Sequence, residues 1–319
     1  MFGILYESDE WSDWKLAQEL KMALGVDAVC MIDMEQDDAL TRAATCDFLV
    51  SRVFASACFR GHDHAHRMME ALLRDERTKD IPLINPAHAH QCEIDKQYAT
   101  ETLGAAGIAV PEIIALGTPP EILAGDTGSS FIHAGDGCQG EDTYRSLDEW
   151  PYPCIIKPNC GGRTTYTAVV YSAKEARMFL QTAPEYVFIV EEYLEPTKGY
   201  LTRVEVIDNE IALVVKRSVA KNGLSSYHEG STYELYPDCP SSVIESVLAA
   251  ARLLDIQFGS FDVIENDAGN FIIDANSVSN VSEDCTALFN LDLMAEYAHA
   301  LARRYRAYKA QSSQEEGRR

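Results

Sequence analysis

Basic residues are scarce in this sequence. The 319 residues contain 27 Lys and Arg against 50 Asp and Glu, which gives a formal net charge of −23. Most of the surface therefore repels nucleic acid and anionic membranes, so we expect neither as a partner. A polyanionic ligand such as ATP would need a local basic pocket and a divalent cation.

Long apolar runs and paired cysteines are also missing. No segment approaches the roughly 20 apolar residues that span a membrane, and the strand-like start Met1–Tyr6 lacks the basic region of a signal peptide. The nine cysteines form no C-x-x-C pair. Cys30, Cys46, Cys92 and Cys154 lie in or beside apolar runs. This pattern is typical of reduced thiols, so we expect a cytoplasmic protein without a disulfide framework.

The order of expected elements predicts an α/β protein. Strands alternate with helices along the first 95 residues, which favours a parallel sheet. Helices are expected over 63–77, 87–103 and 291–308, and a surface excursion over the Gly- and Pro-rich stretch 117–150. We expect the chain to divide into 1–95 (N-terminal domain), 96–190 (central lid), 191–310 (C-terminal subdomain) and a disordered tail, 311–319.

A β-hairpin near the C-terminus carries the most informative polar residues. Two apolar runs, Phe258–Ile264 and Phe271–Asn276, are joined by a turn-like sequence. Asp262, Asp274 and Asn276 can converge, because residues two apart in a strand point to the same face. Such oxygen donors suit Mg²⁺ held together with phosphates. The alternative is an ordinary hairpin with solvated acids.

Two further segments contain candidate nucleotide contacts. Lys157 ends an apolar strand before the loop Asn159–Thr165, where a lysine and backbone N–H groups can meet phosphate oxygens. The loop is not a Walker A motif, and it could equally be a solvated turn. The strand Val187–Leu194 ends in Glu191 and Glu192, an arrangement that suits an adenine ring unless both acids are simply exposed.

Three basic residues stand on adjacent expected strands. Arg203, Lys216 and Arg217 could neutralise a transferring phosphoryl group and an acyl phosphate. The alternative is that they merely pair with Glu205 or Glu210.

Together these features resemble the ATP-grasp superfamily, most closely the branch of the ribosomal-protein glutamate ligase and the lysine-biosynthesis ligases. The similarity covers about residues 81–308 and opens with Asn85–Lys96, followed by Leu103 and Gly107–Pro111. That stretch resembles the family's N-x-x-x-A…DK…L…GI-x-(V/L)-P pattern. The other segments follow in the family's order.

The resemblance implies an ATP-grasp fold with an N-terminal parallel-sheet lobe, a central lid lobe and a C-terminal mixed-sheet lobe. It implies ATP and two Mg²⁺ ions as cofactors, with Mn²⁺ as a substitute. The implied metal ligands are Asp262, Asp274 and Asn276, and the implied catalytic residues are Arg203, Arg217 and Asn276. The implied nucleotide contacts are Lys96, Lys157, Gly161, Gly162, Glu191, Glu192, Tyr193, Leu194 and Lys216.

The activity implied by the resemblance is ligation of a carboxylate to an amine through an acyl phosphate. The partners are then a small carboxylate and an amine, or a peptide, and a homodimer is the assembly that the resemblance suggests, since dimers are common in this superfamily. Two alternatives stay open: an ATP-grasp kinase or phosphotransferase, and a nucleotide-binding protein without catalysis.

The sequence departs from the family at four places. The loop after Lys157 has fewer glycines than usual, and Asp274 replaces the commoner glutamate. Leu201 stands where a ribose-binding acid is often found, which leaves Glu195 as a substitute. The segment 223–230 offers Ser225, Ser226, Tyr227 and His228 in place of the Arg-x-Asn loop of the glutamate ligases. The last departure argues against glutamate as the substrate.

Overall fold

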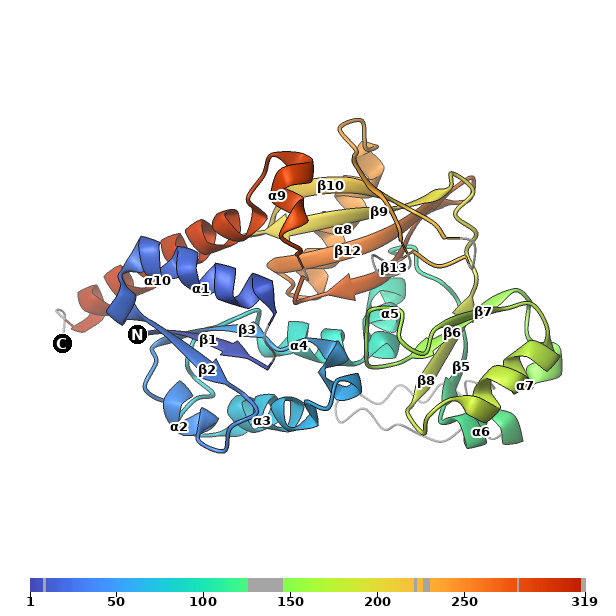
Figure 1. The fold of residues 1–319 in the computed structure, drawn as a ribbon, viewed down its shortest axis with the longest axis horizontal. Coiled ribbons are helices and arrows are strands. Elements are labelled where there is room, and N and C mark those ends of the chain that lie inside the picture. The colour runs from blue at the N-terminus through green and yellow to red at the C-terminus, as the bar shows by residue number, and fades with distance from the viewer. Residues whose placement is uncertain (8–9, 126–145, 221–222, 226–229, 280, 317–319) are drawn as a thin grey trace.

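The computed structural model describes residues 1–7, 10–125, 146–220, 223–225, 230–279 and 281–316. These residues form three lobes, each built on its own sheet (Figure 1). None of the described helices combines the length and the apolar composition that crossing a membrane requires.

The N-terminal lobe contains the predicted parallel sheet. Its order is β2–β1–β3–β4, with β1 Phe2–Tyr6, β2 Val29–Asp33, β3 Phe48–Arg52 and β4 Leu83–Ile84. The helical segments of this lobe are α1 Trp11–Leu24, η1 Val26–Ala28, α2 Ala39–Ala43, η2 Ala55–Phe59 and α3 Asp63–Arg74. Helix α3 therefore ends before the expected residue 77.

The last helix packs on this first lobe. Helix α10 (Leu293–Glu316) lies beside α1 (Figure 1), and its Tyr305 ring contacts Phe2 edge-on at 5.5 Å between ring centroids. Phe2 also stacks on Phe48 at 5.4 Å. Two segments far apart in the sequence therefore share one apolar core. Helix α10 also extends into the tail that we expected to be disordered from residue 311.

The central lobe is a four-stranded antiparallel sheet of order β5–β8–β6–β7. Its elements are β5 Ile113–Gly117, α6 Pro119–Ala124, η3 Leu147–Glu149, β6 Cys154–Pro158, β7 Ala168–Val170, α7 Ala173–Thr182 and β8 Phe188–Glu192. Within the expected excursion 117–150, the structure thus places two short helical segments, while 126–145 lie outside the described residues.

The C-terminal lobe is an antiparallel sheet of order β11–β10–β9–β12–β13. Its elements are β9 Tyr200–Ile207, β10 Glu210–Ser218, β11 Tyr233–Leu235, α8 Ser241–Leu253, β12 Phe258–Asn266, β13 Gly269–Asn276 and α9 Asp284–Phe289. Strands β12 and β13 form the predicted hairpin, in which Asp262 faces Asp274 across the strands.

The single helix expected over 87–103 is two helices, α4 Ala87–Ile94 and α5 Lys96–Ala105. Asp95 separates them in an extended conformation, and its Oδ1 caps α5 by accepting from the Tyr98 backbone N–H at 3.0 Å. Both helices pack in the core beneath β9, β12 and β13. The break brings Lys96 to the first position of α5, where its side chain reaches the C-terminal sheet.

Candidate active site

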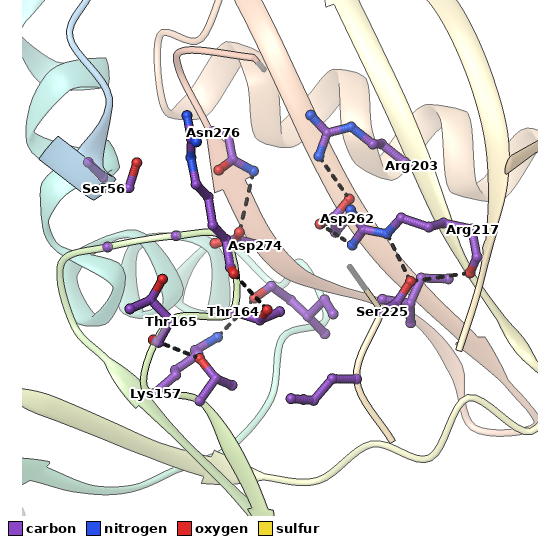
Figure 2. Close-up of a pocket in the computed structure, with 18 of the residues that line it drawn as sticks. Ser56, Lys157, Thr164, Thr165, Arg203, Arg217, Ser225, Asp262, Asp274 and Asn276 are labelled. Atoms are coloured by element: carbon purple, nitrogen blue, oxygen red, sulfur yellow. Dashed lines mark hydrogen bonds and ion pairs between the residues drawn. The ribbon is translucent and has the colours of Figure 1, made fainter. Parts of the chain in front are cut away.

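A cavity of about 540 Å³ lies among the three lobes. Strands β9, β10, β12 and β13 form one wall, and β6, the loop after it and η2 contribute the others (Figure 2). The predicted site residues that line it are Lys96, Lys157, Gly161, Gly162, Glu191, Glu192, Tyr193, Leu194, Arg203, Arg217, Asp262, Asp274 and Asn276.

Lys216 is the exception among the predicted site residues. Its neighbours Val215 and Arg217 line the cavity, so the alternation of strand β10 turns Lys216 to the opposite face. There its ammonium lies over the rings of Tyr236 and Tyr200, at 4.2 and 4.9 Å from their centroids. The structure does not bring Lys216 together with the other predicted nucleotide contacts.

Two lysines enter the cavity from different lobes. Lys157 of β6 donates to the Ile273 carbonyl oxygen at 3.1 Å and forms an ion pair with Glu191 Oε2 at 2.7 Å. Lys96 pairs with Asp274 Oδ1. The side chains of both lysines are only 12 % exposed, which places their charges in a largely dehydrated environment. Such charges interact more strongly with an anionic ligand than surface lysines do.

Asp262 lies between two arginines. Its Oδ2 accepts from Arg217 Nη2 at 2.8 Å, and its Oδ1 from Arg203 Nη1 at 3.4 Å (Figure 2). Ser225 Oγ accepts from Arg217 Nε at 2.9 Å and fixes that guanidinium. Two basic groups and one acid are therefore held together on one face of the sheet, because β12 and β10 both flank β9.

Asp274 and Asn276 stand on the same face of β13. Asn276 Nδ2 donates to Asp274 Oδ2 at 3.4 Å. Burial alone would raise the pKa of Asp274, but the charges of Lys96 and Lys157 outweigh it, so the pKa lies below its usual value. The carboxylate is therefore ionised and able to bind a cation. Among the described residues, no three His, Cys, Asp or Glu side chains are grouped as a ready-made metal site.

The end of β8 and the residues Tyr193 and Leu194 lead from the central lobe to the C-terminal lobe and are called the hinge segment. Glu191 is 1 % exposed, and its Oε1 has no hydrogen-bond partner among the described residues. Glu192 turns away and accepts from the Glu112 backbone N–H at 2.9 Å. The Tyr193 backbone N–H already donates to the Pro153 carbonyl oxygen at 3.3 Å. Leu194 follows at the cavity edge.

The loop after Lys157 is closed against the N-terminal lobe. Gly161 has φ +145°, and a Cβ there would lie 2.1 Å from Phe59 Cε2. Arg163 and Thr164 adopt positive φ angles of 61° and 56°, which are uncommon outside glycine.

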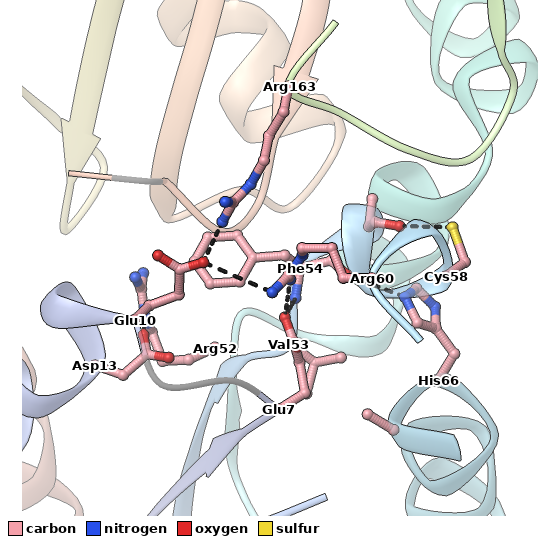
Figure 3. Close-up of polar contacts among 12 residues, drawn as sticks. Glu7, Glu10, Asp13, Arg52, Val53, Phe54, Cys58, Arg60, His66 and Arg163 are labelled. Atoms are coloured by element: carbon pink, nitrogen blue, oxygen red, sulfur yellow. Dashed lines mark hydrogen bonds and ion pairs between the residues drawn. The ribbon is translucent and has the colours of Figure 1, made fainter. Parts of the chain in front are cut away.

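Arg163 ends in a network that the sequence did not reveal. It pairs with Glu10, which also lies 3.6 Å from Arg60, and both guanidinium groups stand near the Phe54 ring (Figure 3). Glu10 and Phe54 line the cavity. They belong to separate loops of the first lobe, so no sequence spacing connects them.

Glu205 is a second residue whose place in the cavity was missed. It follows Arg203 by two positions in β9, and this alternation was a signal in the sequence that both face the same side. Leu201, which stands where a ribose-binding acid is often found in the family, also lines the cavity.

Comparison with known proteins identifies this architecture. No family model matches the chain. A curated relative, the probable alpha-L-glutamate ligase of Pasteurella multocida (strain Pm70), is 22% identical over 243 residues, covering 74% of this chain and 69% of the relative. The RimK domain ATP-grasp protein from Sphaerobacter thermophilus DSM 20745 superposes with a TM-score of 0.64 at 18% identity, over 93% of this chain and 98% of that one.

The chain has the ATP-grasp fold. A second solved structure of this kind, the ATP-grasp ligase PsnB complexed with minimal precursor, Mg and ADP, gives a TM-score of 0.59 at 14% identity, over 94% of this chain and 96% of that one. The predicted fold class and the resemblance to ATP-grasp ligases are thereby confirmed. The hairpin β12–β13 belongs to the C-terminal sheet.

Proposed function

We propose that the chain is an ATP- and Mg²⁺-dependent ligase that joins a carboxylate to an amine through an acyl phosphate. One observation carries this proposal: a single cavity holds Asp262 between Arg203 and Arg217, and Asp274 beside Lys96. Carboxylates that can bind a divalent cation lie next to positively charged side chains that can contact phosphoryl oxygens, as phosphoryl transfer requires.

ATP fits between the lid and the C-terminal sheet. Apolar side chains for the adenine ring line the cavity near the hinge, namely Pro111, Ile155, Leu194, Ile264 and Ile273. Because the Tyr193 N–H is already bonded, Leu194 is the hinge residue whose backbone would meet the adenine edge. Lys96 and Lys157 would then contact the phosphates. The PsnB complex with Mg and ADP supports this use of the fold.

The donor set fits Mg²⁺ in the presence of a nucleotide. Asp262, Asp274 and Asn276 offer the hard oxygens that Mg²⁺ prefers, and phosphate oxygens would complete the coordination, since no group of three acids occurs among the described residues. Bound phosphates would draw Lys96 and the arginines away from the carboxylates, which frees those carboxylates for the metal. The metal would neutralise charge on the transferring phosphoryl group. Two ions and replacement by Mn²⁺ stay predictions.

The proposed reaction has two steps. A substrate carboxylate oxygen attacks the γ-phosphorus, the bond to the bridging oxygen breaks, and ADP leaves. The amine nitrogen then attacks the acyl carbon, the C–O bond to phosphate breaks, and phosphate departs as the amine loses a proton. Arg203 and Arg217 would stabilise the charge in both steps. The lobes exclude water, which protects the acyl phosphate from hydrolysis.

The substrate is expected to lack a second free carboxylate, in contrast with the ligand named for the Pasteurella relative. This prediction rests on the segment 223–230. In that segment, Ser225 accepts a hydrogen bond from Arg217, and residues 226–229 lie outside the described residues. Substitute cations for glutamate are already engaged: Arg52 pairs with Asp13 at 2.8 Å and Arg163 with Glu10, while Lys221 also lies outside the described residues. A peptide substrate and a homodimer stay predictions.

Release of ADP tests the proposal. The protein is incubated with ATP, Mg²⁺ and a panel of amino acids, dipeptides and small carboxylic acids, with and without amines. ADP release that requires both a carboxylate and an amine is the expected result. Release with an acceptor but no amine would identify a kinase, and tight ATP binding without any release would identify a non-catalytic nucleotide-binding protein. Glutamate should be a poorer substrate than neutral amino acids at equal concentration and fixed salt.

A further inference from the structure

The part of the cavity near Arg203 has an apolar wall. Residues of α1, β10 and the C-terminal segment both line the cavity and belong to one apolar cluster, namely Trp11, Leu213, Val281, Phe289 and Leu293. The phosphates of a nucleotide are charged and gain no favourable contact from apolar side chains. The wall therefore belongs to the space for another substrate.

Glu205 is the acid in this apolar surrounding. It is 4 % exposed, lines the cavity, and lies across the strands from Leu213 on β10 and Ser260 on β12. Its Oε1 accepts from Arg203 Nε at 2.8 Å. Its Oε2 is buried without a hydrogen-bond partner among the described residues. A carboxylate oxygen in this state is costly to bury unless a ligand supplies a donor.

We infer that Glu205 binds the ammonium group of the incoming amine, and that the apolar wall accepts an apolar group on the same substrate. This inference rests on the ligase function proposed above. An ammonium group offers three N–H donors and a compact charge, which suits one free carboxylate oxygen. A metal ion suits it less well, because one free carboxylate oxygen beside an apolar wall supplies only a single ligand.

The position also serves the second chemical step. The ammonium transfers a proton to Glu205 Oε2, which leaves a lone pair on the nitrogen. The nitrogen attacks the acyl carbon held near Arg203, phosphate leaves with the electrons of the broken C–O bond, and the second proton of the nitrogen passes to the departing phosphate. Glu205 then returns its proton to solvent. The amine substrate is thus an apolar amine or an amino acid with an apolar side chain.

Calorimetry on the full chain saturated with ADP and Mg²⁺ tests the inference. Three probes separate the two features of the site: 3-methylbutylamine has both charge and apolar group, 3-methyl-1-butanol lacks the charge, and ethanolamine lacks the apolar group. The amine with the apolar group should bind most tightly, by about tenfold over the alcohol, since a charged hydrogen bond is lost in the alcohol. Equal binding of amine and alcohol would overturn the inference.

A pair of matched variants locates the binding. Glu205→Gln keeps the size and the bond to Arg203 but replaces the free oxygen, so it should weaken binding of 3-methylbutylamine about tenfold or more. Glu283→Gln makes the same change at an exposed position of the cavity and should leave binding unaltered. Unchanged affinity in a folded Glu205→Gln protein removes the role of Glu205. If the wild-type protein did not bind ADP, by contrast, the proposed function itself would be refuted.

Two thiols carry an independent inference at the contact between the first lobe and the lid. Cys58 of η2 and Cys160 of the loop after Lys157 both donate to the Ala55 carbonyl oxygen, at 3.2 and 3.6 Å, so a single acceptor holds the two thiols close together. Both are partly exposed. Next to Cys160, Gly161 packs closely on Phe59, so the backbones of the two segments are already held together.

The geometry points to a reversible disulfide between Cys58 and Cys160 that locks the lid loop against the N-terminal lobe. Two S–H bonds break, one S–S bond forms, and two electrons and two protons reduce hydrogen peroxide to water. The link would hinder the loop movement that nucleotide exchange needs. This disulfide does not conflict with the expectation of reduced cysteines, because it would form only under oxidising conditions and would not be a permanent structural bond.

Peroxide treatment followed by alkylation and peptide mass spectrometry tests this site. The cross-linked pair should appear in the wild type, be absent in Cys58→Ser, and persist in the control Cys285→Ser. ADP release from the oxidised protein should slow severalfold and recover with dithiothreitol. Failure to form the cross-link, a different pairing, or unchanged ADP release in the cross-linked protein would each refute the inference.

Discussion

Removing Lys157 tests two roles of one side chain. In the structure its ammonium pairs with Glu191 Oε2 at 2.7 Å, and Glu191 is 1 % exposed. Lys157→Met should therefore leave a buried carboxylate without its cation and lower the free energy of unfolding by about 3–5 kcal/mol. Loss of ATP affinity in this variant alone could reflect that damage rather than a lost phosphate contact.

A second substitution separates the two effects. Glu191→Gln in the Lys157→Met background removes the stranded charge, so most of the lost stability should return. ATP affinity should not return, because the positive charge at the phosphates is still missing. A hydrogen bond to a charged group contributes about 1.5–3 kcal/mol, so ATP should bind roughly tenfold to hundredfold more weakly.

Urea unfolding and titration calorimetry with ATP and Mg²⁺ measure the two quantities on the same preparations. Glu191→Gln alone is the control, because it keeps Lys157 and should bind ATP with higher affinity than the double variant. Wild-type ATP affinity in a folded double variant would show that Lys157 does not contact phosphate. Wild-type stability of Lys157→Met would show that the ion pair contributes nothing to folding.

Three further predictions concern the metal ligands, the lid loop and a buried histidine. Asp262→Asn and Asp274→Asn should each lower the rate of ADP release at least about a hundredfold, since each removes a carboxylate from the proposed metal site. Gly161→Ala should cost about 1–3 kcal/mol of stability and weaken ATP binding, because its Cβ would meet Phe59. Burial lowers the pKa of His90 to about 4 from 6.5, so the unfolded state binds more protons. Stability should fall by about 3 kcal/mol as the pH drops from 6.5 to 4, and His90→Gln should flatten that dependence in urea titrations.

Clear outcomes would contradict these predictions. Normal Mg²⁺-dependent turnover in either Asp→Asn variant would remove the metal site. Gly162→Ala is the control for stability, because the nearest neighbouring atom to its Cβ lies 3.9 Å away, and an equal loss of stability at both glycines would refute the packing argument. An unchanged pH dependence in His90→Gln would assign the acid sensitivity to another group.

The sequence alone was sufficient to predict features that depend on the spacing of residues along one element. Alternation along β12 and β13 places Asp262, Asp274 and Asn276 on one face, and the structure has them there. The same alternation in β10 places Lys216 and Arg217 on opposite faces. Grouping these two residues by their charge did not take the alternation into account. The parallel first sheet follows from strands that alternate with helices, because parallel neighbours need a crossover between them.

Only the tertiary structure decided which distant groups meet. Glu10, Phe54 and Arg163 come from separate loops and pack together across the contact between lobes, and Tyr305 of the last helix covers Phe2 of the first strand. The sequence determines which side chains a strand presents, since its period is fixed by backbone geometry. It does not reveal the partners of those side chains, because long-range contacts depend on how the three lobes pack against one another.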